Sequence, residues 1–308
     1  MRLSFSLNGE KIPWSDPAVQ SLEEAVFYAI VYADIYDYPL TLLEIMRYLV
    51  GQSASRDRVA GALGVLQQAG YIRRQKDYFM LAERTGLAAR RLRRAEVAET
   101  MWPRALAYGR AIARMPFVRM VAITGALPSG NVELGDDIDY LMITEPGRLW
   151  LTRLLIIQLV VKPAARHGDE VCPNYFLSER ALTLQERDLF HAYELAQMVP
   201  IYGLPWYQRL RKANAWADQF LPNAVEPPRV ELVSEVKRRT LPEALLSTRP
   251  VAWLERKEMA RMQTKLTREA STEVEVTPDR CKGHVGGHGH LAGEAFAARI
   301  RYLVNGNG

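Results

Sequence analysis

The chain has 308 residues, of which 48% are hydrophobic and 24% are charged. This balance excludes a disordered or collagen-like protein, and the length suggests about two domains with a sizeable core. Only two cysteines are present, Cys172 and Cys281. They cannot build a disulfide framework, so we expect a reducing, cytoplasmic location.

Nothing in the sequence suggests export or membrane insertion. Residues 1–14 lack the apolar run of a signal peptide. The most apolar stretch, residues 149–161, contains Arg153 and is too short to span a bilayer. We therefore expect a buried helix there and no membrane partner.

The net charge of +5 is distributed unevenly along the chain. Residues 1–116 carry +4, residues 117–180 carry −2 and residues 181–308 carry +3. The total alone is a weak indication of nucleic-acid binding, because it is spread over the whole chain. The acidic middle block instead suggests the place where a cation would bind.

The first block predicts three helices followed by a hairpin. Apolar residues at helical spacing predict a helix over residues 22–36. Thr41 and Glu44 have the spacing of a capping box, which predicts a second helix. A third helix follows a serine cap, and residues 71–80 predict two short strands around a charged tip.

This order of elements resembles a winged helix-turn-helix domain, which would occupy residues 1–82. The resemblance implies DNA or RNA as a partner, with the third helix in a groove and the hairpin on phosphates. The basic residues that would make these contacts are Arg56, Arg58, Arg73, Arg74 and Lys76. The alternative is a packing or dimerisation module, which leaves an oligomer open.

Residues 83–116 predict a long helical connector with a basic cluster, formed by Arg90, Arg91, Arg93 and Arg94. We expect this cluster to be a solvent-exposed helix face. A strip of positive charge that follows phosphates is the alternative.

The acidic block begins with two strands joined by a glycine turn. Residues 118–124 form a compact apolar run that is typical of a buried strand. Gly125 ends this strand, and a helix beginning near Ala126 would direct its N–H groups toward phosphate. Asp137 and Asp139 then fall on one face of the next strand, where two carboxylates can share a divalent cation.

These residues resemble the nucleotidyltransferase superfamily of the DNA polymerase β type, especially its minimal members. The resemblance rests on Gly125, on Gly130 five residues later, and on the Asp-Ile-Asp strand that begins 12 residues after Gly125. It implies a core over residues 117–180, with Mg²⁺ or Mn²⁺ on the two aspartates. The expected substrate is an NTP, by default ATP, and the residues that would shape its phosphate site are Gly125, Ala126, Ser129 and Gly130.

The sequence departs from this family at two positions. Ala126 stands where the family has a serine that would contact phosphate. The next predicted strand, residues 171–177, offers Asn174 where the family often has a third carboxylate, although Asp169, Glu170 and Glu179 flank it. The remaining pair of aspartates suits nucleotide-bound magnesium better than full two-metal catalysis.

The last block, residues 181–308, predicts a C-terminal helical region with a His-rich tail. Its expected helices cover residues 182–198, 207–220, parts of 230–270, and 291–304. In the family, such helices cover the nucleotide and form the acceptor pocket. The isolated residues His167 and His191 are expected to be structural.

The tail from Cys281 to His290 combines Lys282 with His284, His288 and several glycines. The first interpretation is an exposed loop before the final helix. The second has the tail folded into the cleft, with Lys282 or a histidine near the triphosphate. The third is a zinc or nickel site, although its spacing is not that of a standard zinc finger.

The sequence thus predicts an α/β (α+β) protein with a small mixed-sheet nucleotidyltransferase core between a winged helix and a helical C-terminal region. The expected reaction transfers an NMP from an NTP to a hydroxyl of an unidentified acceptor. Asp137 and Asp139 would be its catalytic metal ligands, and Lys282 would offset charge on the leaving group. The alternative is a nucleic-acid-binding regulator whose degenerate core senses a ligand, which Ala126 and Asn174 favour.

Overall fold

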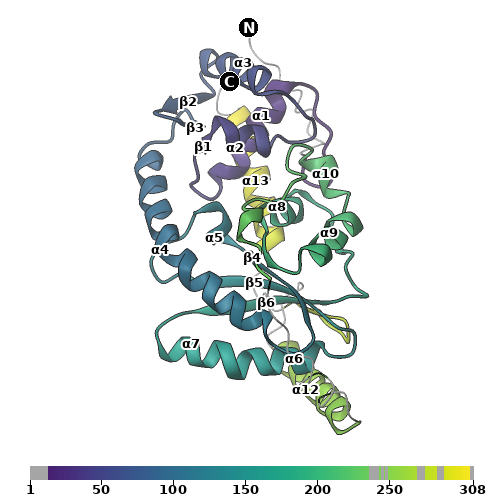
Figure 1. The fold of residues 1–308 in the computed structure, drawn as a ribbon. Coiled ribbons are helices and arrows are strands. Elements are labelled where there is room, and N and C mark those ends of the chain that lie inside the picture. The colour runs from purple at the N-terminus through teal and green to yellow at the C-terminus, as the bar shows by residue number, and fades with distance from the viewer. Residues whose placement is uncertain are drawn as a thin grey trace.

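The structure is a computed structural model that describes residues 13–235, 243, 246, 249–268, 275–282 and 288–305. Helices and mixed β-sheets alternate along this part of the chain (Figure 1), which confirms the predicted mixed α/β class. None of the described helices combines the length and the apolar character needed to cross a bilayer.

The N-terminal unit has the predicted three helices and hairpin. A short strand precedes the second helix, and the three strands form an antiparallel sheet in the order β1-β3-β2. The capping box of Thr41 and Glu44 is present, and Ser55 occupies the N-cap position of the third helix. The elements are α1 (Leu22–Asp34), β1 (Leu40–Thr41), α2 (Leu42–Arg47), α3 (Arg56–Gln68), β2 (Ile72–Gln75) and β3 (Tyr78–Leu81).

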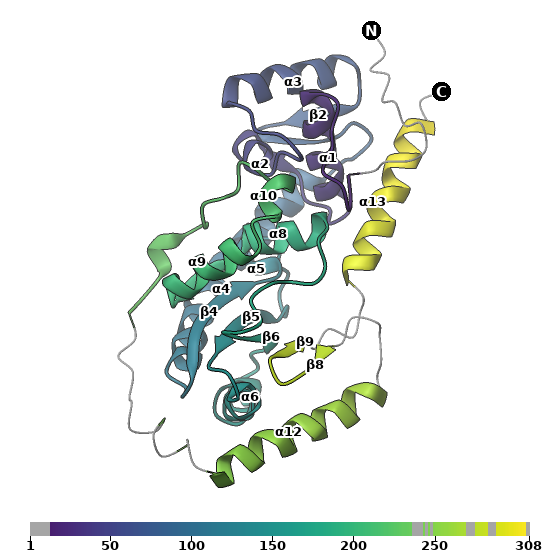
Figure 2. The same ribbon diagram turned by 90° about the vertical axis from the view of Figure 1, so that its right-hand side faces the viewer.

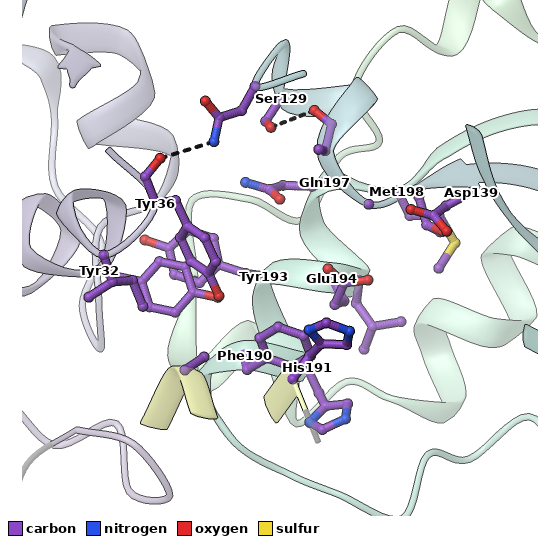
Figure 3. A pocket seen from close by; sticks show the side chains of 18 of the residues that line it. Tyr32, Tyr36, Ser129, Asp139, Phe190, His191, Tyr193, Glu194, Gln197 and Met198 are labelled. Atoms are coloured by element: carbon purple, nitrogen blue, oxygen red, sulfur yellow. Dashed lines mark hydrogen bonds between the residues drawn. The ribbon is translucent and has the colours of Figure 1, made fainter. Parts of the chain in front are cut away.

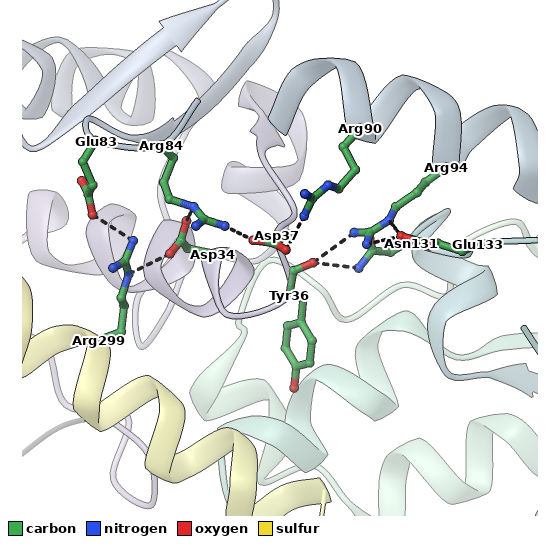
Figure 4. Close-up of polar contacts among 10 residues, drawn as sticks. All are labelled: Asp34, Tyr36, Asp37, Glu83, Arg84, Arg90, Arg94, Asn131, Glu133 and Arg299. Atoms are coloured by element: carbon green, nitrogen blue, oxygen red, sulfur yellow. Dashed lines mark hydrogen bonds and ion pairs between the residues drawn. The ribbon is translucent and has the colours of Figure 1, made fainter. Parts of the chain in front are cut away.

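The connector is the helix α4 (Leu87–Ala113), but its arginine cluster is not a solvent-exposed face. Arg90 pairs with Asp37, Arg91 pairs with Glu44 at 2.6 Å, and Arg94 pairs with Glu133 at 2.7 Å. The expectation was wrong for these three arginines because acidic side chains of the N-terminal unit and the core pack against α4 (Figure 4). Arg93 alone in the cluster is exposed.

A second sheet of six strands forms the core, in the order β7-β4-β5-β6-β9-β8. Only β5 and β6 pair in parallel, and the other neighbours are antiparallel. The strands are β4 (Val118–Thr124), β5 (Ile138–Thr144), β6 (Val171–Ser178), β7 (Val199–Tyr202), β8 (Glu275–Val276) and β9 (Arg280–Lys282).

Three of these strands lie beyond residue 180, in the region predicted to be helical, although each falls between the predicted helices. The sheet is therefore not confined to residues 117–180. Strand β7 has four residues including Pro200, and β8 and β9 are shorter still. Segments this short show no clear periodicity, so their pairing depends on distant strands.

The two faces of the six-stranded sheet are covered by different elements. Alternate residues of β4 and β5 point into two separate cores. One core includes α4, α6 (Leu149–Ile156) and α12 (Arg249–Arg268). A π-helix (Ile157–Val161) and α7 (Lys162–Arg166) complete the connection to β6. The other core includes the N-terminal unit together with α8 (Leu189–Gln197), α9 (Leu204–Ala213), α10 (Ala217–Phe220) and α13 (His288–Asn305).

Two expected helices have different bounds. The helix expected over 182–198 begins only at Leu189, because Asp188 caps it by accepting the N–H of His191 at 2.9 Å. The helix expected over 207–220 is split into α9 and α10 at Asn214. The final helix is confirmed as α13, which runs beside α1 and α8 (Figure 2).

Candidate functional site

The glycine turn lies directly against the acidic strand. Gly125 has φ +70° and ψ −145°, and it leads into the single helical turn α5 (Ala126–Ser129). A Cβ atom added to Gly125 would collide with the carboxylate of Asp139. Only glycine permits both this backbone conformation and this close approach.

Asp137 and Asp139 converge with Cys172 at the ends of β5 and β6. The two carboxylates and the thiol offer ligand atoms that all lie within 4.8 Å of one another. Cys172 lies opposite Asp139 in the parallel pair of strands. Asp137 is exposed, whereas the other two are partly buried. The two aspartates are thus brought together as expected, and β6 contributes a thiol rather than a carboxylate.

The charge of Asp139 is disfavoured by its surroundings. Burial raises its pKa to about 7, and the charges of Asp137 and Glu194 add to this effect. The amide of Asn174, which donates to Asp139 Oδ1 at 2.8 Å, acts in the opposite direction. A cation beside Asp139 would favour its ionised form.

The donor set fits a hard divalent cation through its carboxylates. Carboxylate oxygens are ligands that Mg²⁺ and Mn²⁺ prefer. Burial and the neighbouring aspartates raise the pKa of the Cys172 thiol, and a sulfur donor is in any case softer than the ligands that these cations prefer. The two aspartates are the residues that would hold the metal.

A cavity of about 560 Å³ begins at Asp139 and extends between the two sheets. Its walls come from the end of α1 and the loop after it, the glycine turn, strands β5 and β6, helix α8, and α13. Five residues predicted for the metal and nucleotide site line it, namely Gly125, Ala126, Ser129, Asp139 and Lys282, and Asn174 lines it as well. Gly130 and Asp137 do not belong to the lining.

Several lining residues were missed by sequence reasoning, because they are far apart in the chain. Tyr32 and Tyr36 reach the cavity from the N-terminal unit, and Tyr193 and Glu194 reach it from α8 (Figure 3). His191 was expected to be only structural, but it also lines the cavity. No local pattern marks these positions, since the fold alone brings them together.

Lys282 is buried, with 7% of its surface exposed, and its ammonium already has partners. It lies 3.1 Å from Glu186 Oε1 and 3.5 Å from His191 Nε2. The other nitrogen of His191, Nδ1, lies 2.8 Å from Asp188 Oδ1. Lys282 therefore belongs to a polar chain on the cavity wall rather than offering an unpaired charge.

The remaining expected site residues lie apart from the aspartates. Arg56 and Arg58 are exposed at the start of α3, and Arg74 and Lys76 are exposed in the hairpin. Arg73 is half-buried.

In the tail, His284 lies outside the described residues, so the zinc or nickel hypothesis is not tested there. His288 lines the cavity. His290 is exposed, with Nδ1 3.7 Å from the Glu294 carboxylate.

Comparison with protein-family models, curated proteins and solved structures finds no significant match to this chain.

Proposed function

We propose that the protein is a metal-dependent nucleotidyltransferase that moves an NMP from an NTP to a hydroxyl of an acceptor. One observation carries the proposal: the Gly125 turn packs against Asp139, and Asp137 lies beside it within ligand distance. The resemblance to the nucleotidyltransferase superfamily requires a strand, a glycine turn and a second strand that carries paired aspartates. It also requires the turn to lie against the second strand.

In this proposal Asp137 and Asp139 hold Mg²⁺ or Mn²⁺. When bound, the metal would offset the charge of the triphosphate, which is the chemistry that phosphoryl transfer needs most. The phosphates would lie along the turn, whose backbone is shaped by Gly125, Ala126, Ser129 and Gly130. Asn174 holds the Asp139 carboxylate in place through its hydrogen bond.

The N-terminal unit is proposed to be a winged helix-turn-helix domain. Its order α1-β1-α2-α3-β2-β3 supports this assignment, as do the exposed basic residues on α3 and the hairpin. DNA or RNA binding should weaken with salt, and the double variant Arg73→Ala/Arg74→Ala should weaken it further. Binding that is unaffected by salt and by the double variant would instead favour a packing or dimerisation module.

A second candidate is a regulator whose core senses a ligand without transferring it. The β6 residues nearest Asp139 are Cys172 and Asn174, so this strand supplies no third carboxylate. The cavity also reaches the N-terminal unit, where the Tyr38 hydroxyl donates to the Ser129 carbonyl of the turn. A ligand in the cavity would contact both the N-terminal unit and the core.

The two candidates are distinguished by incubating the protein with labelled NTPs, Mg²⁺ or Mn²⁺, and cell extract, and measuring transfer of the label. The proposal expects label transfer by the wild type and none by Asp137→Asn/Asp139→Asn. The matched control is Asp136→Asn, because Asp136 is an adjacent exposed aspartate outside the metal cluster. Transfer that persists in the double variant would refute the metal assignment, and tight NTP binding without transfer would favour the sensor.

A further inference from the structure

The cavity beside Asp139 has an aromatic wall. The rings of Tyr32 and Tyr193 stack at 3.8 Å with an angle of 8°, and Tyr36 lies 5.6 Å from Tyr32. Phe190 joins them from α8. Figure 3 shows the tyrosines gathered on one side, Asp139 on the other, and Glu194 between them. Aromatic rings attract a cation that lies over their faces.

Glu194 is an acidic group within this wall. Its carboxylate makes no hydrogen bond or ion pair among the residues that the structure describes. Burial raises its pKa, although the charges of His191 and Lys282 act against that rise. Glu194 is only partly buried and lines the cavity, so its carboxylate is open to an occupant that brings a positive charge.

The two cationic groups whose charges act on Glu194 have other partners. Lys282 is taken up by Glu186 and His191, and His191 is itself bonded to Asp188. His288 lines the α13 side of the cavity. Asp139 adds a second carboxylate to the lining. The groups facing the cavity therefore combine aromatic rings with two carboxylates, two histidines and one ammonium that is already paired.

We propose that this cavity binds a small organic cation, an ammonium group carried on an aromatic or other apolar body, with the ammonium at Glu194. A volume of about 560 Å³ is in the ordinary range for small-molecule sites. Asp139 lies at the same cavity, so this molecule would be the hydroxyl-bearing acceptor. That last assignment rests on the proposed function, whereas the binding itself does not.

The test is calorimetric titration of the full chain at pH 8, without NTP or metal. Three probes share one ring system and differ in charge: naphthylethylamine, naphthylethanol and naphthylacetate. We expect naphthylethylamine to bind about tenfold or more tightly than the neutral alcohol, and naphthylacetate to bind most weakly. Equal affinities, or a preference for the anion, would overturn the inference.

The variant Glu194→Gln keeps the shape of the side chain and removes its charge. It should bring the cation and the alcohol to nearly equal affinity and leave the affinity for the alcohol unchanged. The control Glu96→Gln, at an exposed position on α4, should keep the wild-type preference. A cation preference that survives Glu194→Gln would refute the role of this carboxylate.

If Glu194→Gln does not fold, Tyr36→Leu takes its place, because Tyr36 is 39% exposed and its backbone contacts do not depend on the ring. It should lower the affinity for naphthylethylamine about fivefold. An unchanged affinity would contradict the contribution of the Tyr36 ring. Adenosine serves as a fourth probe, and its binding in preference to the cation would make the cavity a nucleoside site. Cation binding without label transfer would remove the proposed function and keep this inference.

Discussion

Replacing Asp139 by Asn should make the stability of the protein less dependent on pH. The fold raises the pKa of this carboxyl from its ordinary value of 3.8 to about 7, first through burial and then through Asp137 and Glu194. A raised pKa stabilises the folded state below pH 3.8, and this contribution is lost as the pH rises to about 7. Between pH 5 and pH 7 the unfolded chain is already ionised while the folded chain holds the proton.

Each pH unit in that window lowers the unfolding free energy of the wild type by about 1.4 kcal/mol. From pH 5 to pH 8 the wild type should thus lose about 3 kcal/mol of unfolding free energy that Asp139→Asn does not lose. The substituted amide can still accept the hydrogen bond from Asn174, so the difference reports the charge rather than a lost contact.

Urea unfolding at pH 5, 6, 7 and 8 in the presence of EDTA measures this difference. The advantage of Asp139→Asn over the wild type should grow from pH 5 to about pH 7 and level off by pH 8. The control Asp136→Asn should run parallel to the wild type, because Asp136 is exposed. An Asp139→Asn curve that is parallel to the wild type across the whole range would refute the reasoning.

Three further results are expected. Adding Mg²⁺ at pH 8 should raise the midpoint of wild-type unfolding and leave Asp139→Asn unchanged, and an equal rise in both would exclude Asp139 as a ligand. Gly125→Ala should lower the unfolding free energy by about 3 kcal/mol or more, since it combines backbone strain with a collision. Gly135→Ala, with φ +98° and no atom within 4 Å of the added carbon, should cost only about 1–2 kcal/mol, and equal losses would contradict the close approach. Arg91→Ala should cost about 1–2 kcal/mol because it removes a partly buried ion pair with Glu44, which keeps its hydrogen bonds from Thr41, whereas Arg93→Ala should change stability by less than about 0.5 kcal/mol. Urea unfolding of each pair at pH 7 measures both differences.

Local sequence patterns predicted the helices and strands that depend on residues close together in the chain. The capping box of Thr41 and Glu44 and the strand over residues 118–124 appear in the structure as expected. The sequence also predicted that Gly125 ends one strand and that Asp139 lies on the next, and these two residues are in contact in the structure. Features that depend on pairing between distant segments were not predictable from one sequence.

Strand β9 illustrates that limit. Its three residues place Lys282 opposite Tyr175 of β6, and nothing in residues 280–282 signals this pairing. The role of His191 was missed for the same reason, since its neighbours come from other segments. The arginines of α4 were misjudged because helical spacing shows which residues share a face, but not what packs against that face.

Helix α13 also has a consequence for the order in which the protein is made. Its residue Phe296 packs against Tyr28 and Tyr32 of α1, and its first turns form one wall of the cavity. The ribosome synthesises α13 after every other described element. The part of α1 that contacts Phe296 therefore stays without this partner through most of translation. Apolar surface exposed on a nascent chain promotes aggregation and is what chaperones bind. Among the described elements, α13 is therefore the last to complete the wall of the cavity.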